Sequence, residues 1–174
     1  MKKNFLLAAA VLCMASAASA QTFSKGDQNI SATVGLGGGY GIPIGVSYEK
    51  GMWDIGSDNN MAIGLGGFVG FSSYAEDFGT YKYTYSNIYL AAEGNFHFTE
   101  FSKWDLYAGL RLGYNVASGS WDDDSVSDLY SVSTGGLIYT THIGANYFLN
   151  DTWAINAELG YGLASLSAGV TYKF

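Results

Sequence analysis

Apolar side chains alternate with small or polar ones along nearly the whole chain after residue 21, and this period of two predicts β-strands. No segment in that region has a sustained helical period. We expect eight strands: Asn29–Gly39, Ile42–Met52, Asn60–Ser72, Tyr83–Phe98, Asp105–Ala117, Val132–Leu149, Trp153–Gly162 and Leu166–Phe174. Most of them reach the roughly 9–11 residues that a tilted strand needs to cross hydrocarbon. The sequence therefore predicts an all-β fold, an eight-stranded antiparallel up-and-down barrel.

The two faces of these strands decide which environment the barrel occupies. In the segment from Asp105 to Ala117, apolar Leu110 and Leu112 alternate with Gly109, Arg111 and Gly113. Eight strands leave an interior only just wide enough for side chains, so the small polar face fits inside. The large apolar face then points outward, which only lipid tolerates. The alternative is a soluble, lipocalin-like periplasmic barrel with the two faces reversed.

The composition supports a continuous sheet and excludes several classes of function. The chain has 24 glycines, 14 tyrosines, 10 phenylalanines and a single proline, which suits a tightly curved sheet rather than a disordered segment. Its formal net charge of −7 argues against nucleic acid as a partner. Cys13 is the only cysteine, so residues 21–174 can form no disulfide and hold no thiol nucleophile.

The first twenty residues have the features of a cleaved signal peptide. Lys2 and Lys3 form a basic region, Phe5–Ala15 is apolar, and Ala18-Ser19-Ala20 matches the small-x-small cleavage pattern. The apolar run is too short to span a bilayer as a helix. We therefore predict two parts, a signal peptide at residues 1–20 and a barrel domain at residues 21–174.

The last strand carries the pattern polar-x-Gly-x-x-aromatic-x-aromatic, with matches at Ser167, Gly169, Tyr172 and Phe174. With the leader and the preceding strands, this pattern makes the chain resemble the OmpA/OmpX-like small outer-membrane barrels of Gram-negative bacteria. It is closer to OmpX, because no peptidoglycan-binding domain follows Phe174. The resemblance implies an outer-membrane monomer in contact with lipid and lipopolysaccharide. It also implies that the C-terminal pattern is read by the barrel-assembly machinery.

Charged residues fall on the face that is expected to line the lumen: Glu49, Glu93, Arg111, Glu158 and Lys173, together with His97 and His142. The resemblance implies a network in which Arg111 bridges two of the glutamates. Since buried charges are tolerated only when paired, water, Lys173 or a proton must balance the remaining negative charge. The favoured interpretation is a structural polar plug. The alternative is a cation-selective path, which the narrow lumen disfavours.

No metal site, cofactor or catalytic site is expected. The two histidines lack the spacing of a zinc site. A hydrolase acting on lipid A would need histidine and serine together on the lipid face, whereas His97 and His142 have the parity of the lumen.

Four outer connections are expected at Gly39–Gly41, Tyr74–Lys82, Ser118–Ser131 and Leu163–Ser165. Two of them are long and hold the candidate surface-binding residues Tyr74, Tyr81, Trp121, Asp122, Asp123, Asp124 and Asp128. Aromatic residues are typical interface anchors, and clustered carboxylates suit hard cations or a basic partner. The sequence thus leaves three roles open: a structural envelope protein, which is favoured, a surface adhesin or binding protein, and a narrow pore.

Overall fold

The computed structural model describes residues 23–38, 41–56, 60–79, 81–121 and 132–174. The expected signal peptide and Asp122, Asp123, Asp124 and Asp128 lie outside this part of the chain. The described strands are β1 (Gln28–Leu36), β2 (Ile44–Ile55), β3 (Met61–Phe78), β4 (Tyr81–Phe101), β5 (Trp104–Trp121), β6 (Val132–Phe148), β7 (Trp153–Tyr161) and β8 (Leu166–Lys173). Each strand falls within or overlaps one of the eight predicted segments.

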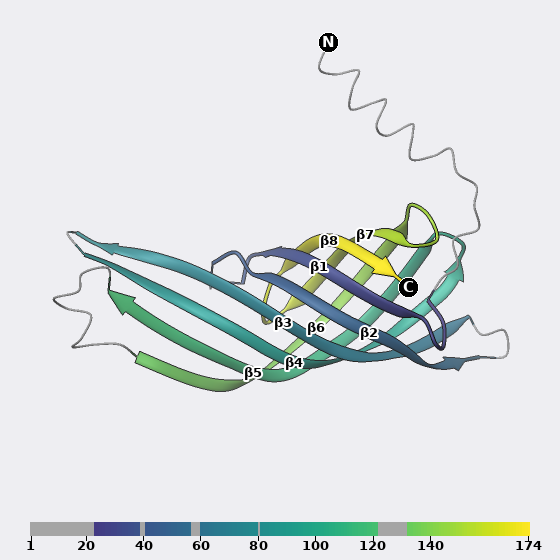
Figure 1. Ribbon diagram of the computed structural model, residues 1–174, viewed down its shortest axis with the longest axis horizontal. Helices are drawn as coiled ribbons and strands as arrows, with labels where there is room; N and C mark the ends of the chain where they lie inside the picture. The colour runs from purple at the N-terminus through teal and green to yellow at the C-terminus, as the bar shows by residue number, and fades with distance from the viewer. Residues whose placement is uncertain (1–22, 39–40, 57–59, 80, 122–131) are drawn as a thin grey trace, which may run out of the picture.

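The strands form one closed antiparallel barrel in sequence order (Figure 1). The ring closes where β1 pairs with β8, for example at Ser31 opposite Thr171. The predicted fold class is confirmed. We call the end that holds Phe174 the periplasmic end and the opposite end the outer end, the orientation in which barrels of this class insert.

The expected outer loop Tyr74–Lys82 is wrong, because this segment is paired strand. The ladder between β3 and β4 continues to Phe78 opposite Tyr81, and only residues 79 and 80 connect the two strands. Alternation persists through the segment, and Tyr74 stacks on its cross-strand partner Tyr85. Such cross-strand aromatic pairs stabilise a hairpin beyond the membrane. Residues 118–121, expected as loop, likewise belong to β5.

The strands β3 to β6 extend beyond the other four at the outer end, as Figure 1 shows. Pairing of β2 with β3 starts at Ile44 opposite Phe71, and pairing of β6 with β7 starts at Thr141 opposite Tyr161. The four-stranded extension is called the outer sheet below. It comprises residues 72–78, 81–87, 117–121 and 132–134.

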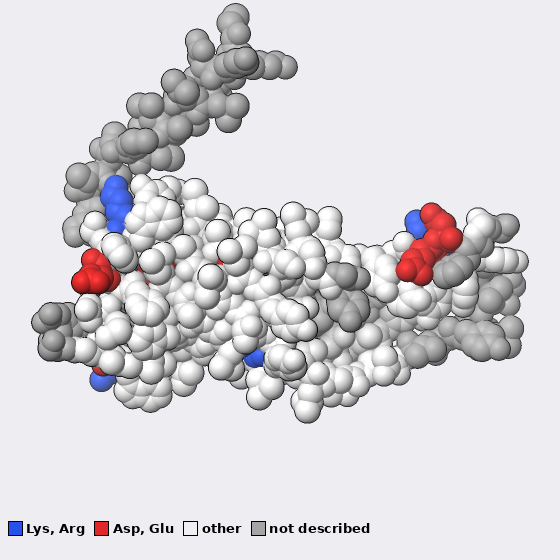
Figure 2. All heavy atoms as spheres, turned by 180° about the vertical axis from the view of Figure 1, so that it is seen from behind, with Lys and Arg blue, Asp and Glu red and all other residues white. Residues whose placement is uncertain are grey.

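The apolar face of the barrel points outward. Leu110, Leu112, Ile155 and Leu159 are 57%, 59%, 50% and 56% exposed, although they sit in the middle of strands. Figure 2 shows charged side chains gathered at the two ends of the barrel and nearly absent from the middle of the visible face. An exposed apolar belt flanked by polar ends is the surface of a membrane barrel, not of a soluble one. No helix in the described ranges is long and apolar enough to cross a membrane.

The lumen is more aromatic than the sequence pattern predicts. Phe68, Tyr89, Tyr107 and Phe148 are all buried inside the barrel. Glycines make room for these rings: a β-carbon at Gly45 would lie 2.4 Å from the ring of Phe68, and one at Gly144 would lie 2.3 Å from the ring of Tyr107. The expectation of a uniformly small and polar inner face is therefore wrong at these four positions.

Candidate functional site: the closed lumen and the outer sheet

Arg111 lies inside the lumen and forms ion pairs with two carboxylates. It lies directly opposite Glu93 in the ladder between β4 and β5, and its Nε donates to Glu93 Oε2. Its Nη2 donates to Glu158 Oε1 on β7 over 3.0 Å. The ring of Phe68 lies 4.7 Å from the guanidinium carbon. All three charged side chains are more than 90% buried, so this is a desolvated charge cluster of the kind that requires complete pairing.

Neutral side chains extend this cluster around the lumen. Asn95 donates to Glu93 over 3.0 Å and accepts a hydrogen bond from His142 Nε2 over 2.9 Å. Tyr107 donates its hydroxyl to Glu158 over 2.9 Å. The structure thus brings together Glu93, Arg111, His142 and Glu158, which are four of the seven lumen residues predicted from the sequence.

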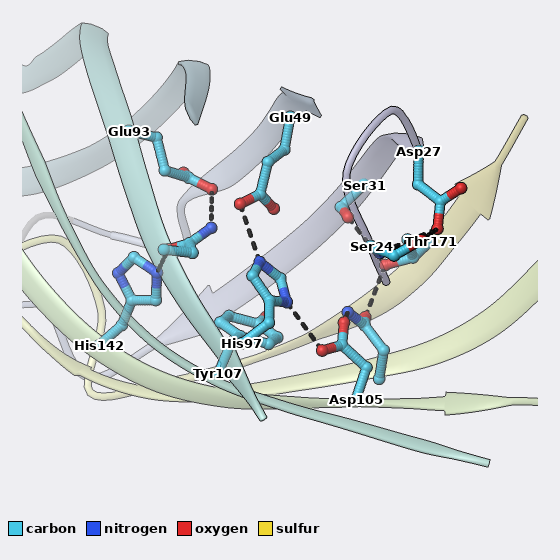
Figure 3. A network of polar contacts seen from close by, with 12 residues as sticks. Ser24, Asp27, Ser31, Glu49, Glu93, His97, Asp105, Tyr107, His142 and Thr171 are labelled. Carbon is cyan, nitrogen blue, oxygen red and sulfur yellow. Dashed lines mark hydrogen bonds and ion pairs between the residues drawn. The ribbon is translucent and has the colours of Figure 1, made fainter. Parts of the chain in front are cut away.

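A second cluster lies nearer the periplasmic end and is centred on His97. Its Nε2 lies 2.9 Å from Glu49 Oε1, and its Nδ1 lies 2.7 Å from Asp105 Oδ1 (Figure 3). An imidazole hydrogen-bonds both carboxylates as a donor only when both ring nitrogens carry hydrogen. Asp105 also accepts a hydrogen bond from Asn146 over 3.0 Å. Glu49 is therefore a partner of His97 and not of Arg111.

Asp105 is a lumen residue that the sequence interpretation missed. It is completely buried and contacts both His97 and Asn146. Its position carried a usable signal, because it lies six positions before Arg111 in the same strand, and residues an even number of positions apart share a face.

The segment 23–27 closes the periplasmic end of the lumen. Phe23 is fully buried and stacks on His97 with ring centroids 4.2 Å apart. Asp27 folds the segment back by accepting from the backbone nitrogen of Ser24 over 3.0 Å. Backbone hydrogen bonds of 2.9 Å between Gly51 and both Gly26 and Asp27 join it to β2.

Lys173, the seventh predicted lumen residue, lies at this periplasmic closure. Its Nζ lies 3.7 Å from Asp27 Oδ2 and 5.4 Å from the centroid of the Phe148 ring. Two of the four lumen carboxylates thus contact Arg111 and the other two contact His97, whereas Lys173 pairs with Asp27 of the N-terminal segment. In the described part of the chain, no three His, Cys, Asp or Glu side chains form a group that could hold a metal ion.

At the outer end, aromatic side chains form a continuous row on the inner face of the outer sheet. Ring centroids lie 4.7 Å apart for Tyr74 and Tyr85, 4.6 Å for Tyr85 and Tyr83, and 4.8 Å for Tyr83 and Trp121. Tyr81 meets Trp121 edge-on at 6.5 Å. We call these five residues the aromatic ladder. It contains the three described surface candidates and adds Tyr83 and Tyr85, which alternation from Glu93 places on the same face.

The C-terminal pattern lies at the seam of the barrel. Tyr172 and Phe174 point outward, with exposed fractions of 38% and 55%. Ser167 and Gly169 face the lumen side, and a β-carbon at Gly169 would lie 1.9 Å from the carbonyl oxygen of Ala32 on β1. A glycine is therefore required where β8 closes against β1.

A family model described as outer membrane protein beta-barrel domain matches residues 5–174 of the chain. The chain belongs to this family. The OmpA/OmpX-like resemblance and the outer-membrane location are thereby confirmed. No curated protein sequence matches the chain.

Solved structures share the fold at low sequence identity. A major outer membrane protein from Thermus thermophilus superposes with a TM-score of 0.62 at 15% identity, covering 85% of this chain and 99% of that one. The N-terminal barrel of Pseudomonas aeruginosa OprF gives 0.58 at 15% identity, covering 86% and 98%. Ail of Yersinia pestis, in complex with the heparin analogue sucrose octasulfate, gives 0.53 at 14% identity, covering 86% and 99%. At such identities the likeness concerns the fold alone.

Proposed function

We propose that this protein is a non-conducting structural barrel that supports the integrity of the outer membrane. The observation that carries the proposal is the closed lumen, with the Arg111 cluster above the His97 cluster and Phe23 below both. The hollow lined by Arg111, His142 and Glu158 measures about 20 Å³, room for about one water molecule. A barrel closed in this way offers no continuous path for a solute.

The first test is electrical. The purified chain, inserted into planar lipid bilayers, should give no stepwise conductance at either polarity. A general porin in the same bilayers serves as the positive control. Reproducible conductance steps that scale with the amount of protein would contradict a closed lumen and favour the narrow cation-selective pore.

The second test addresses the envelope. Cells that lack the protein should become sensitive to detergent, and the wild-type chain should restore resistance. A shortened chain, in which Tyr74–Tyr85 is replaced by Asn-Gly so that Ser73 and Ser86 flank a tight hairpin, should restore resistance equally well. Under a structural role the barrel, and not the outer sheet, protects the membrane. Unchanged detergent resistance in cells without the protein would contradict that role.

A second candidate function is surface binding, and the outer sheet is the feature that favours it. A purely structural barrel needs no strands beyond the membrane, yet β3 to β6 project outward with an aromatic inner face. If the shortened chain keeps the envelope intact but abolishes attachment to a host surface or partner, surface binding replaces the structural proposal.

We also propose that residues 1–20 direct export and that the C-terminal pattern directs assembly. Deleting Phe174 should strongly reduce outer-membrane levels, because this residue supplies the last aromatic ring, stacked 6.0 Å from Tyr172. The measurement is the fraction of heat-modifiable protein in isolated outer membranes. Phe101→Ala, which removes an exposed ring at the same end, is the control. Normal outer-membrane levels of the chain that lacks Phe174 would show that the assembly machinery does not recognise this residue.

A further inference from the structure

The apolar and polar faces of the sheet exchange sides at the outer rim, the level at which the closed barrel ends and the outer sheet begins. Below the rim, the outward face of β3, β4 and β5 ends in three exposed apolar residues, Phe71, Ile88 and Val116. One step further out on the same face stand Ser73, Ser86 and Ser118. The hydrocarbon layer therefore ends at this level. Beyond it the aromatic residues lie on the inner face, so an interfacial girdle facing lipid does not account for them.

The aromatic ladder is held in a fixed arrangement by its own contacts. Its rings contact one another across β3, β4 and β5, stacked for Tyr74 and Tyr85 and edge-to-face for Tyr83 and Trp121. A β-carbon at Gly119 would lie 2.2 Å from the hydroxyl of Tyr83. Beside the rings lies a hollow of about 260 Å³, lined in part by Tyr74, Tyr83 and Tyr85. A ligand that settles there finds aromatic rings already in place, which lowers the ordering cost of binding.

The charge on this face is negative. Alternation places Glu76 on the inner face beside Tyr74, and the β3–β4 register sets it opposite Tyr83. Asp77 and Lys82 face each other across the hairpin on the outer face, and Figure 2 shows acidic and basic side chains side by side at this end. Among the residues described in the outer sheet, no lysine or arginine lies on the inner face.

We propose that the inner face of the outer sheet binds a basic peptide segment, whose lysine or arginine side chains lie on the aromatic ladder and pair with Glu76. Tryptophan and tyrosine faces attract cations through the ring quadrupole, and a nearby carboxylate adds to that attraction. The aromatic ladder extends over three neighbouring strands, whereas a single ammonium or guanidinium group covers about one ring. The ladder can therefore accommodate several cationic side chains of one peptide. This inference rests on the surface-binding candidate and names the chemistry of its partner.

The test compares two fluorescent peptides that differ only in carrying arginine or its neutral analogue citrulline. The full-length chain in detergent micelles should bind the arginine peptide. Its affinity for the citrulline peptide should be lower by about tenfold or more. Tyr83→Leu and Trp121→Leu should each weaken binding of the arginine peptide about fivefold, because leucine retains apolar area but lacks the ring quadrupole. Tyr114→Leu, which removes a ring on the lipid face, is the matched control and should change nothing.

Glu76→Gln and Asp77→Asn form a second matched pair, since they remove the same charge from neighbouring residues on opposite faces. Only Glu76→Gln should weaken binding of the arginine peptide, by about threefold. Equal effects of the two substitutions, or equal binding of both peptides, would overturn the proposal. Retained heat-modifiable gel mobility shows that each variant is folded. If neither peptide binds while the shortened chain still loses attachment, the inference fails and surface binding stands.

Discussion

Replacing Arg111 by leucine is expected to lower the free energy of unfolding of the barrel by about 3–5 kcal/mol, because it strands two buried carboxylates. Glu93 and Glu158 are both more than 90% buried and depend on the same guanidinium. Leucine supplies neither charge nor hydrogen-bond donors, and the narrow lumen leaves little water to replace them. The measurement is a urea titration of the folded chain in micelles.

Two companion variants show whether stranded charge causes this loss. Arg111→Lys keeps a positive charge but loses the planar fork that reaches both carboxylates, so its loss should be smaller. The triple variant Arg111→Leu, Glu93→Gln, Glu158→Gln should recover most of the stability, since it leaves no unpaired charge. Full stability of Arg111→Leu in urea would show that the cluster is solvated. If the triple variant does not regain stability, the loss of unfolding free energy comes from lost packing against Phe68 and not from unpaired charge.

The barrel could be predicted from sequence because the strand period of two sorts every residue onto one of two faces. Placing Leu110 outward places Arg111 inward, and the same parity carries Glu93, His142 and Glu158 to the lumen. Strand number and overall order follow from eight such segments joined by turns. This argument is insensitive to errors of a few residues at the strand ends.

The partners within the lumen could not be predicted in the same way. His97 on β4 meets Glu49 on β2 and Asp105 on β5, and this meeting depends on the tilt and stagger of the strands. Alternation alone contains neither quantity. The same holds for Phe68 and Tyr107, whose rings find room against glycines of the adjacent strands, Gly45 and Gly144.

The sequence pattern predicts loops where the outer sheet lies, because polar and acidic residues interrupt the outward apolar face there. In the segment Tyr74–Lys82, the apolar and polar faces have exchanged sides, so a search for outward-facing apolar residues stops at the membrane. The pairing of β3 with β4 itself continues to Phe78 opposite Tyr81. The exchange of faces is therefore a sequence signal for strands that leave the bilayer.

Phe23 lies outside every predicted strand, and its role is visible only in the folded chain. Phe23→Ala should lower the free energy of unfolding by about 3 kcal/mol, because it leaves a cavity where a fully buried ring stacks on His97. Phe23→Leu, which keeps most of the apolar volume, should lose less. Phe101→Ala removes a ring that is 50% exposed at the same end and is the control for ring removal as such.

The same substitution, Phe23→Ala, should also make the periplasmic end of the lumen, where His97 lies, accessible to reagents. In Phe23→Ala, a histidine-modifying reagent added to the folded chain should modify His97 faster than in the wild type, with the product located by mass spectrometry. His142 should remain protected, since the Arg111 cluster lies between it and the periplasmic end. Equal modification of His97 in both chains would show that segment 23–27 does not seal the lumen. Faster modification of both histidines would show that the barrel has loosened as a whole, because a local opening at Phe23 reaches only the lower cluster.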